Sequence, residues 1–227
     1  MSDKIVSATD EFTRPANTTA YTAGDVVSIN QTITAASNAA PIIVTCTAHG
    51  LVTGDKVTIA SVGGNTAANA SWTVTLLSSS TFSLQGSTGN GAYTSGGTIA
   101  RVGTIADISR LSGTGRIRQF QLHTNNATVT NGTFKVYIYK AAPAAILDNA
   151  AWTLLHANRA NLVAVSGVLT LATEGTGSDA AVAVSSVDIP FQVANGGNDL
   201  FAVLVAQAAY TPASGQLFTL KVDIEKQ

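Results

Sequence analysis

Short runs in which apolar and polar residues alternate constrain the fold of this chain more than any other feature of its sequence. In residues 215–225 the apolar side chains occupy every second position, at Phe218, Leu220, Val222 and Ile224. Residues 132–140 repeat the pattern at Phe134, Val136 and Ile138. Because successive side chains of a β-strand point to opposite faces, a period of two gives each strand one face that avoids water. Both runs therefore predict strands that pack one face against a core.

Further strand-like runs are separated by turns that contain glycine or asparagine, at 25–34, 42–47, 56–60, 71–77, 81–85, 98–102, 116–123, 162–172, 181–189 and 199–207. Many short strands at this spacing are typical of a β-sandwich or barrel. One segment differs, because Asp148 can cap free N–H groups and is followed by residues that favour helices. We therefore expect an all-β fold with one short helix near 148–158.

Charged side chains are scarce. They make up 11% of the residues, against roughly 25% in an ordinary soluble domain, and they leave a net charge of −1. No cluster of Lys and Arg is available to neutralise phosphates, so we expect no nucleic-acid partner. The sequence has neither a long apolar run nor a secretion signal, so we expect no membrane partner and synthesis in a cytoplasm. Charges on edge strands limit association in β-proteins, and their scarcity indicates a surface covered by partners.

Composition also suggests that one domain is inserted into another. Two stretches rich in small residues, 34–41 and 94–103, enclose a segment whose only charged residues from 36 to 103 are Asp55, Lys56 and Arg101. Long insertions in surface loops cost little closure entropy, and they succeed best where their two ends lie close together. We predict that 36–103 form a small, barrel-like β-module inserted in a host domain built from 1–35 and 104–227.

The glycine-rich stretch 48–74 raises the question of a phosphate-binding loop. A P-loop needs GxxxxGK followed by Ser or Thr at the start of a helix. Here the sequence GDK at 54–56 precedes a β-branched run at 57–59, which favours a hairpin-type turn. His49 has no second metal-ligating residue at ligand spacing, so we predict that it caps a turn.

Other candidate sites are weak. Cys46, the only cysteine, alternates with apolar residues and is expected to pack in a core. Arg116 and Arg118 share one side of a strand, which would suit a small anion site or, more simply, a solvated or interface face. Glu174 and Asp179 offer too few carboxylates for a calcium site. We therefore expect no metal, no cofactor, no small-molecule substrate and no enzymatic activity.

The motifs HGL, GDKV, GGN, WTV, TFSL and GxYxSGG follow one another in residues 47–101. This ordered series resembles a small β-module that recurs in structural proteins of tailed bacteriophages. That module is in turn similar to the first catalytic-cysteine half-domain of ubiquitin-activating enzymes. Cys46 lies outside the matching motifs, so the resemblance implies no activity.

The flanking segments 12–28, 148–165 and 204–225 are similar to phage structural proteins found near head genes. The resemblance implies an auxiliary capsid component with a jelly-roll-type β-sandwich. We expect a head decoration protein on the capsid surface of a virion, with the major capsid protein and copies of itself as partners. A homotrimer is expected because the three-fold sites of capsids offer that symmetry.

The polar N-terminal segment precedes any strong strand signal. We expect it to be an arm that is ordered by contact with the capsid, at a cost in conformational entropy that the interface must offset. Phe12, Arg14 and Pro15 are its candidate capsid-binding residues.

Two other classes of function stay open. A tail, baseplate or fibre subunit would contact a host surface through the inserted module, and Trp72 and Tyr93 exposed together would favour it. An enzyme would require converging carboxylates, or His123 beside His156.

Overall fold

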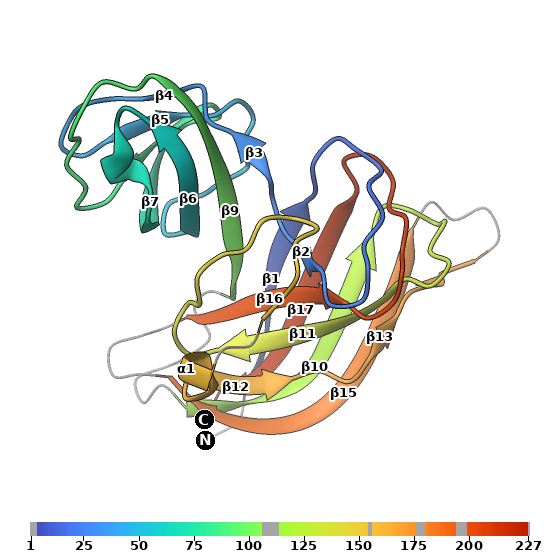
Figure 1. Ribbon diagram of the computed structural model, residues 1–227. Coiled ribbons are helices and arrows are strands. Elements are labelled where there is room, and N and C mark those ends of the chain that lie inside the picture. Colours follow the sequence, from blue (N-terminus) through green and yellow to red (C-terminus); the bar gives the residue numbers. More distant parts are fainter. Residues whose placement is uncertain (1–3, 106–113, 154–155, 176–179, 194–198, 227) are drawn as a thin grey trace. The chain divides into compact units, whose positions relative to one another are not determined.

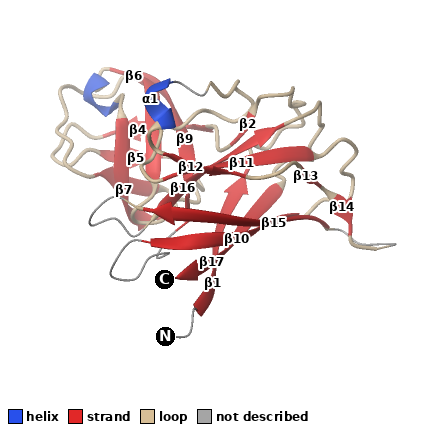
Figure 2. Cartoon of the chain, turned by 90° about the horizontal axis from the view of Figure 1, so that it is seen from below, coloured by secondary structure: helices blue, strands red, loops and turns tan. Residues whose placement is uncertain are grey.

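The computed structural model describes residues 4–105, 114–153, 156–175, 180–193 and 199–226. Strands make up almost all of its regular structure, and helices are confined to two short turns (Figure 2). The predicted all-β sandwich is confirmed. The chain divides into two compact units, which we call the sandwich unit (Met1–Val27, Gly103–Pro143, Asn149–Gln227) and the module unit (Ser28–Val102, Ala144–Asp148).

The sandwich unit contains two antiparallel sheets (Figure 1). The first sheet has the order β1 (Lys4–Thr13), β17 (Leu217–Lys226), β10 (Thr114–Thr124), β15 (Ala181–Gln192) and β14 (Ala172–Thr173). The second sheet has β11 (Thr133–Tyr139) between β12 (Leu162–Val165) and β16 (Leu200–Ala206). Smaller additions to this second sheet are β13 (Leu169–Thr170) on β11, and β2 (Val26–Val27) and the end of β9 (Ser95–Ile105) on β16.

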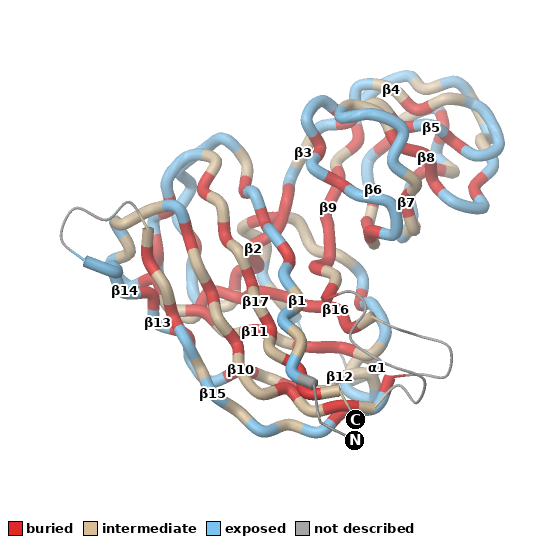
Figure 3. The backbone as a smooth tube through the Cα atoms, turned by 180° about the vertical axis from the view of Figure 1, so that it is seen from behind, coloured by how far each residue is buried: buried red, intermediate tan, exposed pale blue. Residues whose placement is uncertain are grey.

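The core of the sandwich unit is built by the dry faces that the alternating runs predict. Phe218 on β17 and Phe134 on β11 are both fully buried, and their ring centroids lie 5.3 Å apart, which joins the two sheets. Buried and partly exposed residues alternate along β10 and β17 (Figure 3). Burying one such side chain contributes about 1.5–3 kcal/mol, so these faces supply much of the driving force for folding.

The module unit contains an antiparallel run of strands that belongs to the 12-stranded sheet. Its order is β9, β6 (Lys56–Gly63), β7 (Ser71–Ser78), β8 (Thr81–Leu84), β5 (Ile43–Thr45) and β4 (Ala35–Ala36), with β3 (Gln31–Thr32) paired to β9. A single 3-10 turn spans Thr66–Ala68. The sheet encloses a separate core that includes Ile42, Val44, Val74, Phe82 and Ile99. Among the residues that the structure describes, no sheet closes into a barrel. The predicted insert of 36–103 lies almost wholly in this unit, and its folding as an independent domain stays a prediction.

The helix is shorter than the segment 148–158 that the sequence suggests. The described helix α1 spans only His156–Arg159. Asp148 does not begin it, because its side chain accepts a hydrogen bond from the Ser28 N–H at 3.2 Å. Trp152 N–H donates to the carbonyl of Gly24 at 2.7 Å, so the backbone here pairs as an extended chain instead of coiling. No helix in the described parts of the chain is long and apolar enough to cross a membrane.

Gly64 allows two backbone segments of the module unit to approach closely. It has φ +77°, and a Cβ at this position would lie 1.9 Å from the carbonyl oxygen of Ala92. Gly86 has a similar φ of +73° but open space where a Cβ would stand.

We expect Gly86→Ala to lower the free energy of unfolding by about 1–2 kcal/mol, because alanine disfavours the left-handed backbone. Gly64→Ala should lower the free energy of unfolding clearly more, because the backbone at Ala92 must also move to make room for the added Cβ. Thermal denaturation of the two variants measures the difference, and equal melting temperatures would contradict the close approach.

Candidate functional site

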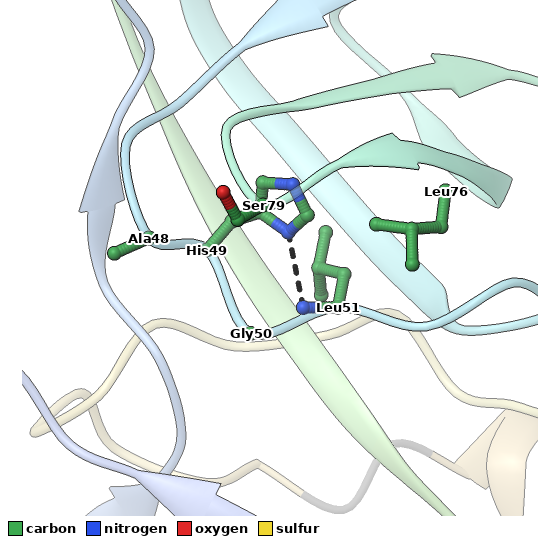
Figure 4. A pocket seen from close by; sticks show the side chains of 6 residues that line it. All are labelled: Ala48, His49, Gly50, Leu51, Leu76 and Ser79. Carbon is green, nitrogen blue, oxygen red and sulfur yellow. Dashed lines mark hydrogen bonds between the residues drawn. The ribbon is translucent and has the colours of Figure 1, made fainter.

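A hollow of about 480 Å³ opens on the surface of the module unit. One side is the loop that carries Ala48, His49, Gly50 and Leu51, and the other is the end of the β7–β8 hairpin with Leu76 and Ser79. Figure 4 shows the side chains of His49, Leu51 and Leu76 lying side by side between these two segments. None of the six lining residues carries a formal charge with His49 neutral.

The local sequence explains how the loop holds this shape. Ala48 and Gly50 both adopt positive φ angles, 49° and 66°, which turn the chain sharply around His49. The His49 Nδ1 accepts a hydrogen bond from the Leu51 N–H at 3.0 Å, so the ring caps the turn, as predicted. The Nε2–H then donates to the carbonyl of Ser78 at 3.0 Å, and the ring edge packs on Phe82 with centroids 5.1 Å apart.

These contacts limit what the hollow can do chemically. His49 is buried and both of its ring nitrogens are already in hydrogen bonds. A general base or a metal ligand needs a free nitrogen lone pair, which this arrangement does not offer. Recognition of apolar groups is therefore the chemistry that the hollow supports best.

Large apolar side chains are exposed on the two chain segments that line the hollow. Val52, Leu76 and Leu77 are 57%, 40% and 52% exposed. A register shift in the β7–β8 pairing lies between Leu76 and Ser78, so Leu77 has no cross-strand partner in the ladder. Bulges of this kind re-aim side chains, and here one presents two consecutive leucines to solvent. Thr53 Oγ1 accepts a hydrogen bond from the Leu76 N–H at 3.0 Å and ties the loop to this strand.

Of the three charged residues in 36–103, two are buried and one is half-buried. Arg101 binds both carboxylate oxygens of Asp55, at 3.1 Å and 3.3 Å, and both side chains are buried. Asp55 also accepts a hydrogen bond from the Val52 N–H at 2.9 Å, which closes the predicted Gly-Asp turn. Lys56 is half-buried and its Nζ donates to Thr73 Oγ1. The sequence shows these three charges but not that two of them form a buried pair.

The two module aromatics that would mark a host-binding surface are not exposed together. Trp72 and Tyr93 are half-buried and pack against the module core. The Trp72 Nε1–H donates to the carbonyl of Ala68 at 2.8 Å. The Tyr93 hydroxyl lies 3.1 Å from the carbonyl oxygen of Ile33. Both aromatic side chains therefore have packing and hydrogen-bonding roles within the module.

The expectation of a free N-terminal arm is wrong for residues 4–13, which form strand β1 and pair with β17 along their whole length. Phe12 is 1% exposed and belongs to the sandwich core. Arg14 is also buried, donates to the carbonyl of Asn17 at 2.7 Å, and places its guanidinium carbon 5.1 Å from the centroid of the Tyr21 ring. Pro15 is half-buried. Polar and apolar residues alternate only weakly along this strand, so the sequence pattern does not predict it. A capsid-binding role for Phe12, Arg14 and Pro15 stays a prediction.

Arg116 and Arg118 face carboxylates instead of an open anion site. Arg116 makes a two-pronged contact with Asp188 at 2.7 Å and 2.6 Å, and Arg118 contacts Asp188 and Glu225. The hydrogen bond from Arg116 lowers the pKa of Asp188, and the same bond raises the pKa of Arg116. Because the guanidinium groups are already paired, this side of β10 is an ion-paired strand face.

Of the two acidic residues weighed as calcium ligands, Glu174 is described and Asp179 lies outside the described residues. Among the residues that the structure describes, no group of His, Cys, Asp and Glu is arranged to hold a metal ion. His123 lies on β10 with its Nε2 3.4 Å from Gln121 Oε1, whereas His156 begins α1.

Cys46 lies in the module core, as expected, with its sulfur 3.3 Å from Gln31 Oε1. Burial raises the pKa of its thiol from 9.0 to about 11. We expect native protein to react slowly with iodoacetamide near pH 9.0, the ordinary pKa of this thiol, and unfolded protein to react fast. Because the unfolded thiol ionises first, its contribution to the free energy of unfolding should fall as pH rises from 9.0 to about 11. Equal alkylation rates with and without denaturant would contradict this burial.

Comparison with known proteins concerns the module alone. A family model described as the Ubiquitin-activating enzyme E1 FCCH domain matches residues 39–102. This match confirms the similarity of the ordered motifs of 47–101 to the first catalytic-cysteine half-domain of ubiquitin-activating enzymes. Their resemblance to a module of phage structural proteins stays a prediction. No curated protein matches the chain. Residues 39–102 are thus a β-rich module similar to the first catalytic-cysteine half-domain of ubiquitin-activating enzymes.

Proposed function

We propose that the protein is a non-catalytic structural subunit of a bacteriophage virion, and specifically a head decoration protein that binds the outside of the capsid. In this proposal it acts as an oligomer, with the major capsid protein and copies of itself as partners. It needs no cofactor, metal, nucleic acid, membrane or small-molecule substrate for this role.

The observation that carries the proposal is the way the module unit handles its charges. Asp55 and Arg101 neutralise each other in the interior, and Lys56 is half-buried. The remaining surface is uncharged and carries exposed leucines around a hollow. A surface of this kind suits lasting contact with other proteins, because large exposed apolar patches mark interaction sites.

The sandwich unit supports the same proposal with separate observations. Its two sheets pack a continuous aromatic and aliphatic core. Its ion-paired face on β10 is solvated and its charges are compensated. A decoration protein needs a rigid scaffold with contact surfaces, and this unit offers both. The resemblance of the flanking segments to phage head proteins adds the virion as the place where these surfaces would be used.

A position in the tail, baseplate or fibre is the alternative within the same class. It predicts an exposed aromatic platform on the module, whereas Trp72 and Tyr93 are half-buried and hydrogen-bonded to backbone carbonyls. The half-buried aromatics favour the head over the tail.

The proposal is tested by asking whether the protein travels with virus particles. Particles from an infected culture are banded in a density gradient, washed, and their proteins identified by mass spectrometry. We expect peptides of this chain in the particle band in a fixed ratio to the major capsid protein. A host cytoplasmic protein in the same gradient is the control for trapping. Finding the chain only in the soluble fraction would contradict the proposal.

A further inference from the structure

A short segment far along the chain belongs to the module unit. Residues Ala144–Asp148 lie between Pro143 and Asn149, which are both in the sandwich unit, yet they cluster with Ser28–Val102. We call Ala144–Asp148 the strap. Both the predicted insert and the family match leave it out. An inserted domain needs only its own two ends to join its host, so the strap is a further connection between the module and the rest of the chain.

Asp148 fixes the end of the strap. Its side chain is 7% exposed and accepts a hydrogen bond from the Ser28 N–H at 3.2 Å. The Asp148 N–H donates in turn to the carbonyl of Ile29 at 3.4 Å. Hydrogen bonds of this kind are what makes a buried carboxylate tolerable, because burial removes its hydration. Asp148 therefore holds the strap to the first residues of the module unit.

Ser28 connects this end of the strap to β9 as well. Its side chain is fully buried, and its hydroxyl donates to the Arg101 carbonyl at 2.9 Å and accepts from the Arg101 N–H at 3.3 Å. The Arg101 side chain is a member of the buried ion pair with Asp55. Ser28 thus joins three segments that lie far apart in the sequence, namely its own, β9 and the strap.

A second attachment lies near the beginning of the strap. The Ala145 N–H donates to Thr58 Oγ1 on β6 at 2.9 Å. The same Thr58 oxygen lies 3.0 Å from Ser71 Oγ, where β6 pairs with β7. Between the two attachments, Ile146 and Leu147 are half-buried. All five residues of the strap are described and none of them lies in a strand or a helix, so its position depends on the attachments near its ends.

We propose that the strap opens and closes as one unit, so that the attachments of Asp148 to Ser28 and of Ala145 to Thr58 form and break together. A short segment outside the sheets opens at a lower free energy than the strands beneath it. While the strap is closed, the module also holds the chain between β11 and α1. While it is open, only the module's own two ends join it to its host. This inference stands apart from the role on a virion, because it concerns the free protein.

Amide hydrogen exchange of the isotopically labelled full chain tests whether the two attachments are coupled. Asp148→Ala removes the acceptor of the Ser28 N–H. We expect it to raise the exchange rate of the Ala145 N–H by about tenfold or more, as for the loss of a hydrogen bond to a charged, buried acceptor. Thr58→Val removes the other acceptor and should speed exchange of the Asp148 N–H, because coupling between two sites is reciprocal.

Ser87→Ala is the matched control. Ser87 is also buried in the module, where its hydroxyl accepts from the Ile42 N–H at 2.9 Å and donates to the Leu84 carbonyl at 2.7 Å. The replacement therefore removes a buried side-chain acceptor of a backbone N–H without touching the strap. It should leave the exchange rate of the Ala145 N–H unchanged.

An Ala145 N–H that exchanges at the wild-type rate in the Asp148→Ala protein would overturn the proposal, because the attachments would then break independently. An equal rise in the Ser87→Ala protein would also overturn it, because it would show general loosening of the module. So would an Ala145 N–H that already exchanges at the rate of an unfolded chain in the wild type. Thr58→Val carries the test alone should Asp148→Ala fail to fold.

Discussion

Asp55→Ala is expected to lower the free energy of unfolding of the module unit by about 3–5 kcal/mol, because it removes one member of a buried ion pair with Arg101. The pair is well shielded, since the two side chains are 2% and 8% exposed. The substitution also removes the acceptor for the Val52 N–H at the turn before β6. The first loss acts on β9, which carries Arg101, and the second acts on the turn before β6.

The measurement is urea denaturation followed by the fluorescence of Trp72, in a Trp152→Phe background so that the module aromatic reports alone. Lys56→Ala is the matched control, because Lys56 is adjacent and charged but half-buried, and it should cost less than about 1 kcal/mol. The double replacement Asp55→Leu with Arg101→Met should recover much of the loss, because buried ion pairs can be replaced by apolar residues of similar volume. Equal effects of Asp55→Ala and Lys56→Ala would contradict a buried ion pair.

Deleting residues 4–13 is expected to abolish cooperative unfolding of the sandwich unit. The deletion strips β17 of a ten-residue pairing partner and removes Phe12 from the core. The packing there is close, because a Cβ added at Gly103 would lie 2.5 Å from the Phe12 ring. Asp10 of the same strand accepts the Thr104 N–H at 3.0 Å, so the strand contacts the end of β9 as well.

Two point variants separate the contribution of the Phe12 side chain to the core from the contribution of the pairing between β1 and β17. Phe12→Ala should cost about 3–5 kcal/mol as a large-to-small core substitution. Ile5→Ser is the control, because Ile5 lies on the same strand but is 61% exposed, and it should stay within about 0.5 kcal/mol. Calorimetry of the three variants gives the comparison. A truncated protein that melts as the wild type does would contradict a structural role for β1 and would favour an arm that is ordered only by contact with the capsid.

The strands and their buried faces could be predicted from the sequence because each depends on a local period. Phe218 to Ile224 and Phe134 to Ile138 alternate cleanly, and the structure buries these apolar positions fully. His49 could be assigned to a turn for a similar reason, since it adjoins Gly50 and precedes another glycine turn. Local patterns determine local structure, and these features needed no knowledge of distant contacts.

The features that escaped prediction depend on pairings between distant residues. In β1 the polar Asp10 is buried and accepts a hydrogen bond from the Thr104 N–H, whereas the apolar Ile5 is 61% exposed. The pairing of Asp55 with Arg101 joins the turn before β6 to β9, although the presence of only three charges in residues 36–103 was a usable signal. The hollow depends on a loop and a hairpin end that meet only in the folded chain.

The proposed role on the virion is tested most directly by electron microscopy of purified particles labelled with a gold-conjugated antibody against this chain. The expected result is gold on the outer surface of the head, repeated over its facets and absent from particles treated with a pre-immune serum. Label confined to the tail or fibres would move the protein to the alternative position. Particles without label, from a preparation whose infected cells contain the protein, would contradict the proposed function.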